Sequence, residues 1–182
     1  DMNLFGNRLF ALAMALVLVA SGTLFGVHRS TDAVGEKIET MFYEGVDGSG
    51  YGIAGDLTDR LDYSQYLCKI AGGFSGLEEQ IEAVQDARLD LDTASGHHEQ
   101  FTANEALTDA VYALDAAMTQ AGYASEEWER YLNNFDSDGM TITHEAEKFN
   151  AQVRDYNSGI LGGFPVNVLR VPAAVEELEE FA

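Results

Sequence analysis

The sequence has few of the residues that cross-link a chain or bind polyanions. It contains a single cysteine, Cys68, which excludes an intrachain disulfide and a zinc site built from several cysteines. Lysine and arginine together number 10, against 31 aspartates and glutamates, so the net charge is −21. Because phosphate binding requires a basic surface, we expect no nucleic-acid partner. The length of 182 residues, 46% of them hydrophobic, suffices for one domain with a core.

Charged residues are absent from one long stretch near the N-terminus. The nineteen residues from Leu9 to Val27 read LFALAMALVLVASGTLFGV, with Arg8 and Arg29 outside them. Roughly 20 apolar residues cross a bilayer as a helix, whereas the apolar region of a cleaved signal peptide has only about 7–15. We therefore predict that residues 1–29 form an uncleaved transmembrane anchor, with residues 9–27 in the membrane.

Small residues recur within this stretch at helical spacing. Gly22 and Gly26 are four residues apart, as are Ala11 and Ala15. This spacing lets two membrane helices approach closely, so it is compatible with self-association.

The flanking charges barely decide the orientation of the anchor. One arginine precedes the stretch, and His28 with Arg29 follows it. The chain beyond contains three lysines and no basic cluster near the membrane, and the sequence begins at Asp1 rather than at a methionine. We expect upstream residues that carry the cytoplasmic lysines and arginines. We therefore predict a single-pass protein of a bacterial cytoplasmic membrane whose bundle lies outside the cytoplasm.

Apolar residues after the anchor recur every three or four positions, which predicts helices and no strands. Residues 30–50 should form a juxtamembrane segment, with an amphipathic helix over 30–44 and then the glycine-rich hinge EGVDGSGYG. The further helices are expected over residues 51–71, from Ser75 to a turn at Gly96, over 102–120, over 126–133 and from Thr143 to Gly162-Gly163. The fold class is therefore all-α: an N-terminal transmembrane helix followed by an antiparallel up-down helical bundle over residues 51–171.

Two of these helices have clear apolar seams, and two serines are expected caps. Ser75 and Glu78 fit a capping box, and Ser125 is placed to cap the helix that starts at Glu126. The seams comprise Leu107, Val111, Leu114, Met118 and Ala121 in one helix, and Ala146, Phe149, Val153, Tyr156 and Ile160 in the other.

The last helix ends in the phrase RDYNSGILGGFPVN. The pairs Phe149-Asn150 and Tyr156-Asn157 lie seven residues apart, so the aromatic residues fall on the seam and the asparagines beside it, where an amide can bond a neighbouring helix. Gly162-Gly163 is expected to end the helix. Phe164 should then fold back as a buried plug, and Pro165 should prevent the helix from resuming.

Residues 149–169, FNAQVRDYNSGILGGFPVNVL, resemble the C-terminal signature of the LemA family. The matching residues are Phe149, Asn150, Tyr156, Asn157, Phe164, Pro165 and Asn167. VQDARLDLDTA (84–94) and ANEALTDAVYALDAAM (103–118) are similar to earlier stretches of that family. The resemblance implies a membrane segment followed by an antiparallel helical bundle, and it supplies no catalytic residues. SGYGIAGDLTDRLDYSQYL departs from the family because it is broken by glycines and lacks an Ile-Pro-Asn-Leu-Val motif.

One segment has the spacing of a calcium-binding loop. NFDSDGMTITHE, residues 134–145, places oxygen ligands at positions 1, 3, 5 and 12 and glycine at position 6 of an EF-hand pattern. The candidate calcium ligands are Asn134, Asp136, Asp138 and Glu145. Asparagine at position 1 departs from that pattern, and Asp-Ser-Asp-Gly is also ordinary turn chemistry. A metal-free polar turn is therefore the alternative.

Other candidate sites lack a defined geometry. His97-His98 with Glu99 and the distant His144 fix no third metal ligand by spacing, and Cys68 falls on a core stripe. No arrangement resembles a nucleophile with its base, so we expect no enzymatic activity. The acidic C-terminal tail covers residues 172–182. Its end, VEELEEFA (175–182), is expected to fray; the alternative is that it docks through Leu178 and Phe181.

These observations predict a non-enzymatic, membrane-anchored scaffold or interaction module of the LemA type, with a protein partner or self-association. One alternative is a structural subunit of a homo-oligomer or filament packed through the apolar N-terminal helix. The other is a receptor domain that binds calcium or another ligand at residues 134–145.

Overall fold

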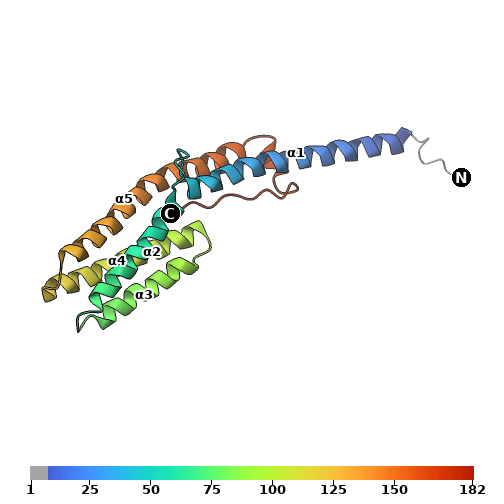
Figure 1. Ribbon diagram of the computed structural model, residues 1–182. Helices are drawn as coiled ribbons and strands as arrows, with labels where there is room; N and C mark the ends of the chain where they lie inside the picture. Colours follow the sequence, from blue (N-terminus) through green and yellow to red (C-terminus); the bar gives the residue numbers. More distant parts are fainter. Residues whose placement is uncertain (1–7) are drawn as a thin grey trace. The chain divides into compact units, whose positions relative to one another are not determined.

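The computed structural model describes residues 8–182, and every regular element in that range is a helix. The elements in chain order are α1 (Arg8–Glu44), α2 (Ile53–Ala71), α3 (Glu78–Thr93), α4 (His97–Ala121), α5 (Glu126–Arg154), the π-helix η2 (Asp155–Ile160) and α6 (Val166–Leu169) (Figure 1). The all-α prediction is confirmed, with no strand between residues 8 and 182. Residues 1–7 of the expected anchor lie outside the described range.

The chain divides into two compact units, and we describe each by itself. The first unit contains the described residues up to Lys37 together with Arg154–Leu178. The second unit contains Ile38–Val153 together with Glu179–Ala182.

Helix α1 is longer than either helix expected from the sequence. The apolar stretch and the amphipathic segment over 30–44 form one helix of 37 residues. The predicted break lies directly after α1. The chain leaves the helix at Gly45 with φ of +82°, a conformation that favours glycine. It is the one helix in the described chain that is long and apolar enough to cross a membrane, a property that a signal sequence shares.

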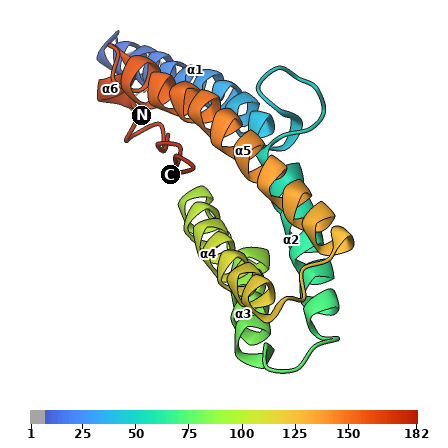
Figure 2. The same ribbon diagram turned by 90° about the vertical axis from the view of Figure 1, so that its left-hand side faces the viewer.

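The second unit packs α2, α3 and α4 side by side (Figures 1 and 2). The predicted seam of α4 is confirmed, because Leu107, Val111, Leu114 and Met118 are fully buried, although Ala121 is exposed. Trp128 at the start of α5 is also buried, and its indole N–H donates to Asp115 Oδ1 at 2.7 Å. The helix begins as expected, with Ser125 Oγ accepting the Trp128 N–H at 3.2 Å.

The prediction of a loop at residues 134–145 is wrong. Glu126–Arg154 is one helix of 29 residues, so the short helix over 126–133 and the last long helix are continuous. The reason is a run of large apolar residues at a spacing of seven, each buried, that passes through the supposed loop: Trp128, Phe135, Ile142 and Phe149. Their burial outweighs the turn preference of Asp-Ser-Asp-Gly.

Gly139 fits this helix because of a close approach rather than a turn. A Cβ at this position would lie 2.2 Å from Arg60 Nη1. Arg60 is buried, with its guanidinium 3.9 Å from the centre of the Phe135 ring and Nη2 donating to Thr108 Oγ1 at 2.5 Å. The glycine therefore makes room for a buried cation between helices.

The expected capping box of α3 is not formed. Leu77 occupies the N-cap position, and no side chain caps the helix there. Ser75 thus lies two residues before the N-cap position of the helix that begins at Glu78.

Burial predicts the stability of this core. Leu107→Ala should lower the free energy of unfolding by roughly 2–5 kcal/mol, because it leaves a cavity in a fully buried site. The matched control Leu89→Ala removes a side chain that is 60% exposed and should change it by less than about 0.5 kcal/mol. Urea unfolding of the full chain in detergent, followed by circular dichroism, measures both values. Equal losses would contradict this packing.

Candidate functional site

The last four residues fill an aromatic pocket in the second unit. Phe181 is 1% exposed, and its ring centre lies 5.6 Å from that of Phe42 and 5.4 Å from that of Phe101. Phe42 in turn contacts Phe149 at 5.5 Å and the His97 ring at 4.2 Å. Edge-to-face and tilted contacts of this kind stabilise aromatic clusters beyond the area they bury. We call residues 179–182 the tail, and we call the other four rings of this cluster the tail pocket: Phe42, His97, Phe101 and Phe149.

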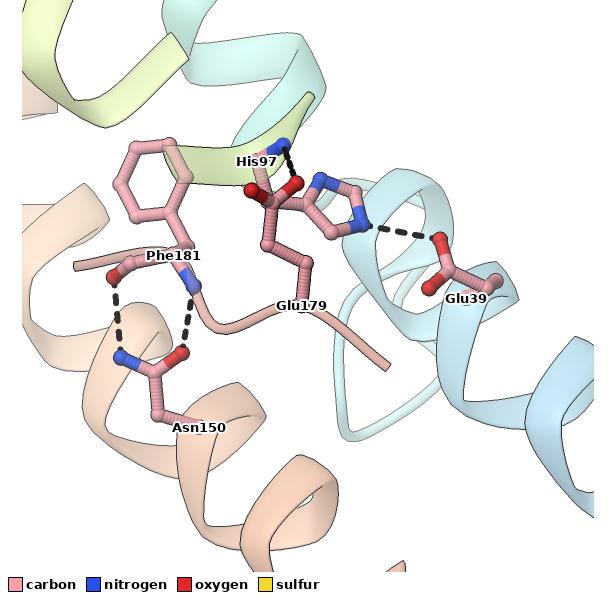
Figure 3. A network of polar contacts seen from close by, with 5 residues as sticks. All are labelled: Glu39, His97, Asn150, Glu179 and Phe181. Atoms are coloured by element: carbon pink, nitrogen blue, oxygen red, sulfur yellow. Dashed lines mark hydrogen bonds and ion pairs between the residues drawn. The ribbon is translucent and has the colours of Figure 1, made fainter. Parts of the chain in front are cut away.

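Asn150 holds the tail by its backbone (Figure 3). Its Nδ2 donates to the Phe181 carbonyl at 2.9 Å, and its Oδ1 accepts the Phe181 N–H at 2.8 Å. The amide thus does for one residue what a neighbouring strand would do. Asn150 is itself buried, so both of its bonds are formed away from water, where an unmade bond costs most.

The carboxylate of Glu179 binds the first turn of α4 (Figure 3). Its Oε2 accepts the His97 N–H at 2.9 Å. A Cβ at Gly96 would lie 2.7 Å from that oxygen, so glycine is needed for this approach. A negative charge here is favourable because the first N–H groups of a helix lack partners within it.

Histidines complete the edges of the tail pocket. His97 Nε2 lies 2.8 Å from Glu39 Oε2, which fixes the ring that packs against Phe42. His98 Nδ1 contacts the Ala182 carbonyl oxygen. The two neighbouring histidines therefore point to different partners, and neither is available to a shared metal ion.

The first unit contains a second asparagine clamp of the same kind. Asn157 Nδ2 donates to the Leu178 carbonyl at 2.8 Å, and its Oδ1 accepts the Leu178 N–H at 2.9 Å. Tyr156 beside it is buried, and a Cβ on Gly35 would lie 3.6 Å from its hydroxyl. Both Tyr/Phe-Asn pairs of the sequence phrase thus combine a buried ring with an amide that binds extended backbone.

The predictions for the two Tyr/Phe-Asn pairs are correct only in part. The burial of Phe149 and Tyr156 is confirmed, but Asn150 and Asn157 bind the C-terminal segment rather than a neighbouring helix. The expectation that residues 175–182 fray was wrong. The docking alternative is confirmed for the Phe181 ring, which is buried, while Leu178 is half-buried and is held by its backbone.

The expectations for the end of the phrase were also wrong. Phe164 is 85% exposed and is no plug; Phe181 has the buried position instead. A helix resumes directly after Pro165, which is preceded by a cis peptide bond and is followed by α6. Asn167 lies in that short helix and is exposed.

The four candidate calcium ligands do not surround a common point. All lie in α5, whereas an EF-hand needs a loop that wraps around the ion. Asn134 is exposed, and Asp136 accepts a hydrogen bond from the Tyr112 hydroxyl at 3.0 Å. Among residues 8–182 no group of three or more histidine, cysteine, aspartate or glutamate side chains could hold a metal ion.

Asp138 and Glu145 instead face a buried carboxylate of α2. Burial, together with the charges of Asp138, Asp59 and Glu145, raises the pKa of Asp56 to about 6. Asp138 Oδ2 and Glu145 Oε2 are both buried without a hydrogen-bond partner, although Lys148 binds the other Glu145 oxygen at 2.7 Å. Cys68 is a buried free thiol, as expected, and burial raises its pKa.

Sequence reasoning missed most of the tail pocket. Phe101 and Glu179 were not singled out. The available signal was the acidic C-terminal segment, residues 175–182, in which Leu178 and Phe181 are the two large apolar residues. Their spacing of three gave no indication of which helices would receive them.

Comparison with models of known protein families finds no match for this chain, and comparison with curated proteins finds none either. The resemblance to the LemA family therefore stays a prediction.

Two phenylalanines test the tail pocket against the original expectation. Phe181→Ala should lower the free energy of unfolding by roughly 3–5 kcal/mol, because a buried ring is lost. Phe164→Ala removes an exposed ring and should change it by less than about 0.5 kcal/mol. Both are measured by urea unfolding. A larger loss for Phe164 would restore the plug interpretation.

Asp56 should make stability fall as pH rises. Its pKa in the folded chain, about 6, exceeds the ordinary value of 3.8, so the folded state holds this proton more tightly than the unfolded state. The stabilising effect is complete below about pH 4 and is lost as pH rises through 6. Asp56→Asn should reduce the loss between pH 4 and 7 by at most about 3 kcal/mol. Asp92→Asn, at an exposed carboxylate, is the control; equal pH profiles for both variants would refute the assignment.

Proposed function

We propose that this protein is a non-enzymatic, membrane-anchored interaction module of the LemA type. The observation that carries the proposal is the uncovered apolar surface of α1. Within its apolar stretch, over residues 10–27, seven large apolar side chains are at least 45% exposed: Leu12, Met14, Leu16, Val17, Leu18, Val19 and Phe25. Such a surface is unfavourable in water and favourable in lipid.

The length of this surface supports a membrane span. Nineteen uncharged residues at the helical rise extend about 28 Å, close to the roughly 30 Å of a hydrocarbon core. Helical geometry also satisfies every backbone group within the segment, as a lipid environment requires. A cleaved signal sequence or a helix packed in a homo-oligomer would expose the same residues before processing or assembly.

The role of the polar residues supports a binding module rather than an enzyme. Asn150, His97 and Glu179 are engaged with one another or with the tail backbone. The carboxylates of Asp56 in α2 and of Asp138 and Glu145 in α5 act on one another, because the charges of the latter two raise the pKa of Asp56. The module therefore offers shape and backbone hydrogen bonds to a partner.

Family membership rests on the C-terminal phrase. The two Tyr/Phe-Asn pairs that resemble the LemA signature have matching roles, with a buried ring and a clamping amide in each. A repeated motif with a repeated physical role supports a shared architecture. The bundle is proposed to lie outside the cytoplasmic membrane of a bacterium, with the N-terminus inside.

Membrane extraction tests the anchor. The full chain expressed in bacteria should stay in the membrane pellet at alkaline pH, which strips peripheral proteins. Leu18→Arg places a charge in the middle of the span, at a cost of roughly 2.5–3.5 kcal/mol, and should release part of the protein. Met140→Arg, at a position that is 75% exposed on α5, should not. Full release of the unaltered chain would exclude an anchor and leave the oligomer or a cleaved signal.

Protease added to intact cells, with the outer envelope opened, tests the orientation. The bundle should be degraded while a cytoplasmic marker survives. Protection of the bundle until lysis would place it in the cytoplasm.

A further inference from the structure

The tail is held in the second unit as a bound peptide is held, and not as a helix of a bundle. It has no helical structure, and its backbone bonds go to the side chains of Asn150 and His98. Its buried ring, Phe181, enters the tail pocket, and the carboxylate of Glu179 meets the His97 N–H. Backbone pairing together with a pocket for one side chain is how extended peptides are recognised in general.

None of these contacts requires that the tail and the pocket belong to one molecule. The pocket residues lie between Glu39 and Asn150 in the sequence, and the tail begins at Glu179. Residues 154–178, which connect the two parts, belong to the first unit, so the chain passes to the second unit where the tail begins, between Leu178 and Glu179. A second copy of the chain would therefore offer the same bonds to the same pocket.

We propose that the tail pocket also takes residues 179–182 of a second copy of this chain, so that copies associate by exchanging tails. The exchange loses no contact, because each tail leaves one pocket and enters an identical one. This inference rests on the proposed role as an interaction module and names its partner.

The tail in the same molecule is the competitor. A tethered segment has an effective concentration in the millimolar range, so exchange in dilute solution is disfavoured. Confinement of anchored copies to a membrane raises their local concentration and shifts the balance toward exchange. Damage to a molecule's own tail should do the same, because it empties that molecule's pocket.

Charge predicts an unusual salt dependence. The net charge is −21, and the tail adds Glu179 and Glu180 to an acidic surface, so copies repel one another at long range. The Asn150 bonds that hold Phe181 act at about 3 Å and are buried, whereas the bond between Glu179 and the His97 N–H is exposed. Added salt screens the repulsion more than these buried bonds, and association should become stronger with salt.

Complementary variants test the exchange. Asn150→Asp damages the pocket and leaves the tail intact, because it replaces the donor to the Phe181 carbonyl by an oxygen. Phe181→Ala damages the tail and leaves the pocket intact. Full-length chains with two different affinity tags are mixed in detergent, and one tag is used to recover the other. We expect the mixed pair to be recovered on the order of tenfold more than either variant with itself, the loss that removal of a buried anchor typically causes.

The controls separate this contact from others. Association through α1 would give equal recovery in all combinations and would overturn the proposal. Asn134→Asp makes the same change at an exposed site of α5 and should behave as the unaltered chain. Gly96→Ala is a second pocket variant, because its Cβ meets the Glu179 carboxylate; it keeps the test valid if Asn150→Asp does not fold by circular dichroism.

A labelled synthetic peptide of residues 175–182 probes the pocket alone. It should bind the Phe181→Ala chain and should bind a chain with both Phe181→Ala and Gly96→Ala roughly tenfold more weakly. Absence of binding to the single variant would overturn the proposal. Binding of the peptide without recovery of the mixed pair would also overturn it, and would assign the pocket to another protein's segment. Neither result depends on membrane extraction, so failure of the anchor is distinguishable from failure of the exchange.

Discussion

A buried peptide group must have hydrogen-bond partners, and at Phe181 one side chain supplies both. Asn150 accepts the Phe181 N–H and donates to its carbonyl, at 2.8 and 2.9 Å. Without these bonds the ring could enter the aromatic pocket only by burying two unpaired backbone groups, each at a cost of roughly 1–3 kcal/mol. The seating of the tail among the rings of Phe42 and Phe101 depends on this pair of bonds.

This constraint explains how an all-helical protein holds an extended segment. The described chain has no strand that could pair with the tail, so the amides of Asn150 and Asn157 take that role, each for one residue. An amide can do this because it carries a donor and an acceptor side by side. Aspartate has the same shape but no donor, and alanine has neither, which is why the residue type matters at both positions.

The seven-residue repeat of apolar side chains predicted the fold better than local turn signals did. The helical class and the seams of α4 and of the end of α5 follow from the spacing of their apolar residues. Asp-Ser-Asp-Gly at 136–139 suggested a loop, but Phe135 and Ile142 on either side of it continue the buried heptad, and Gly139 accommodates Arg60. The tail pocket could not be predicted, because its parts come from α1, α4, α5 and the C-terminal segment. Their meeting depends on tertiary packing, which no local spacing encodes.

The charge of the chain determines what kind of contact can hold the tail. With a net charge of −21, attraction between distant groups cannot bring an acidic segment to an acidic bundle. Glu179 is nevertheless bound, because it meets the unpaired N–H of His97 at the start of α4 rather than a basic side chain. The same local donors would act on a tail of either origin, and the repulsion around them limits binding to a segment that can form all of the short contacts together. The tail of this chain is therefore held by backbone geometry and one aromatic ring, without long-range attraction.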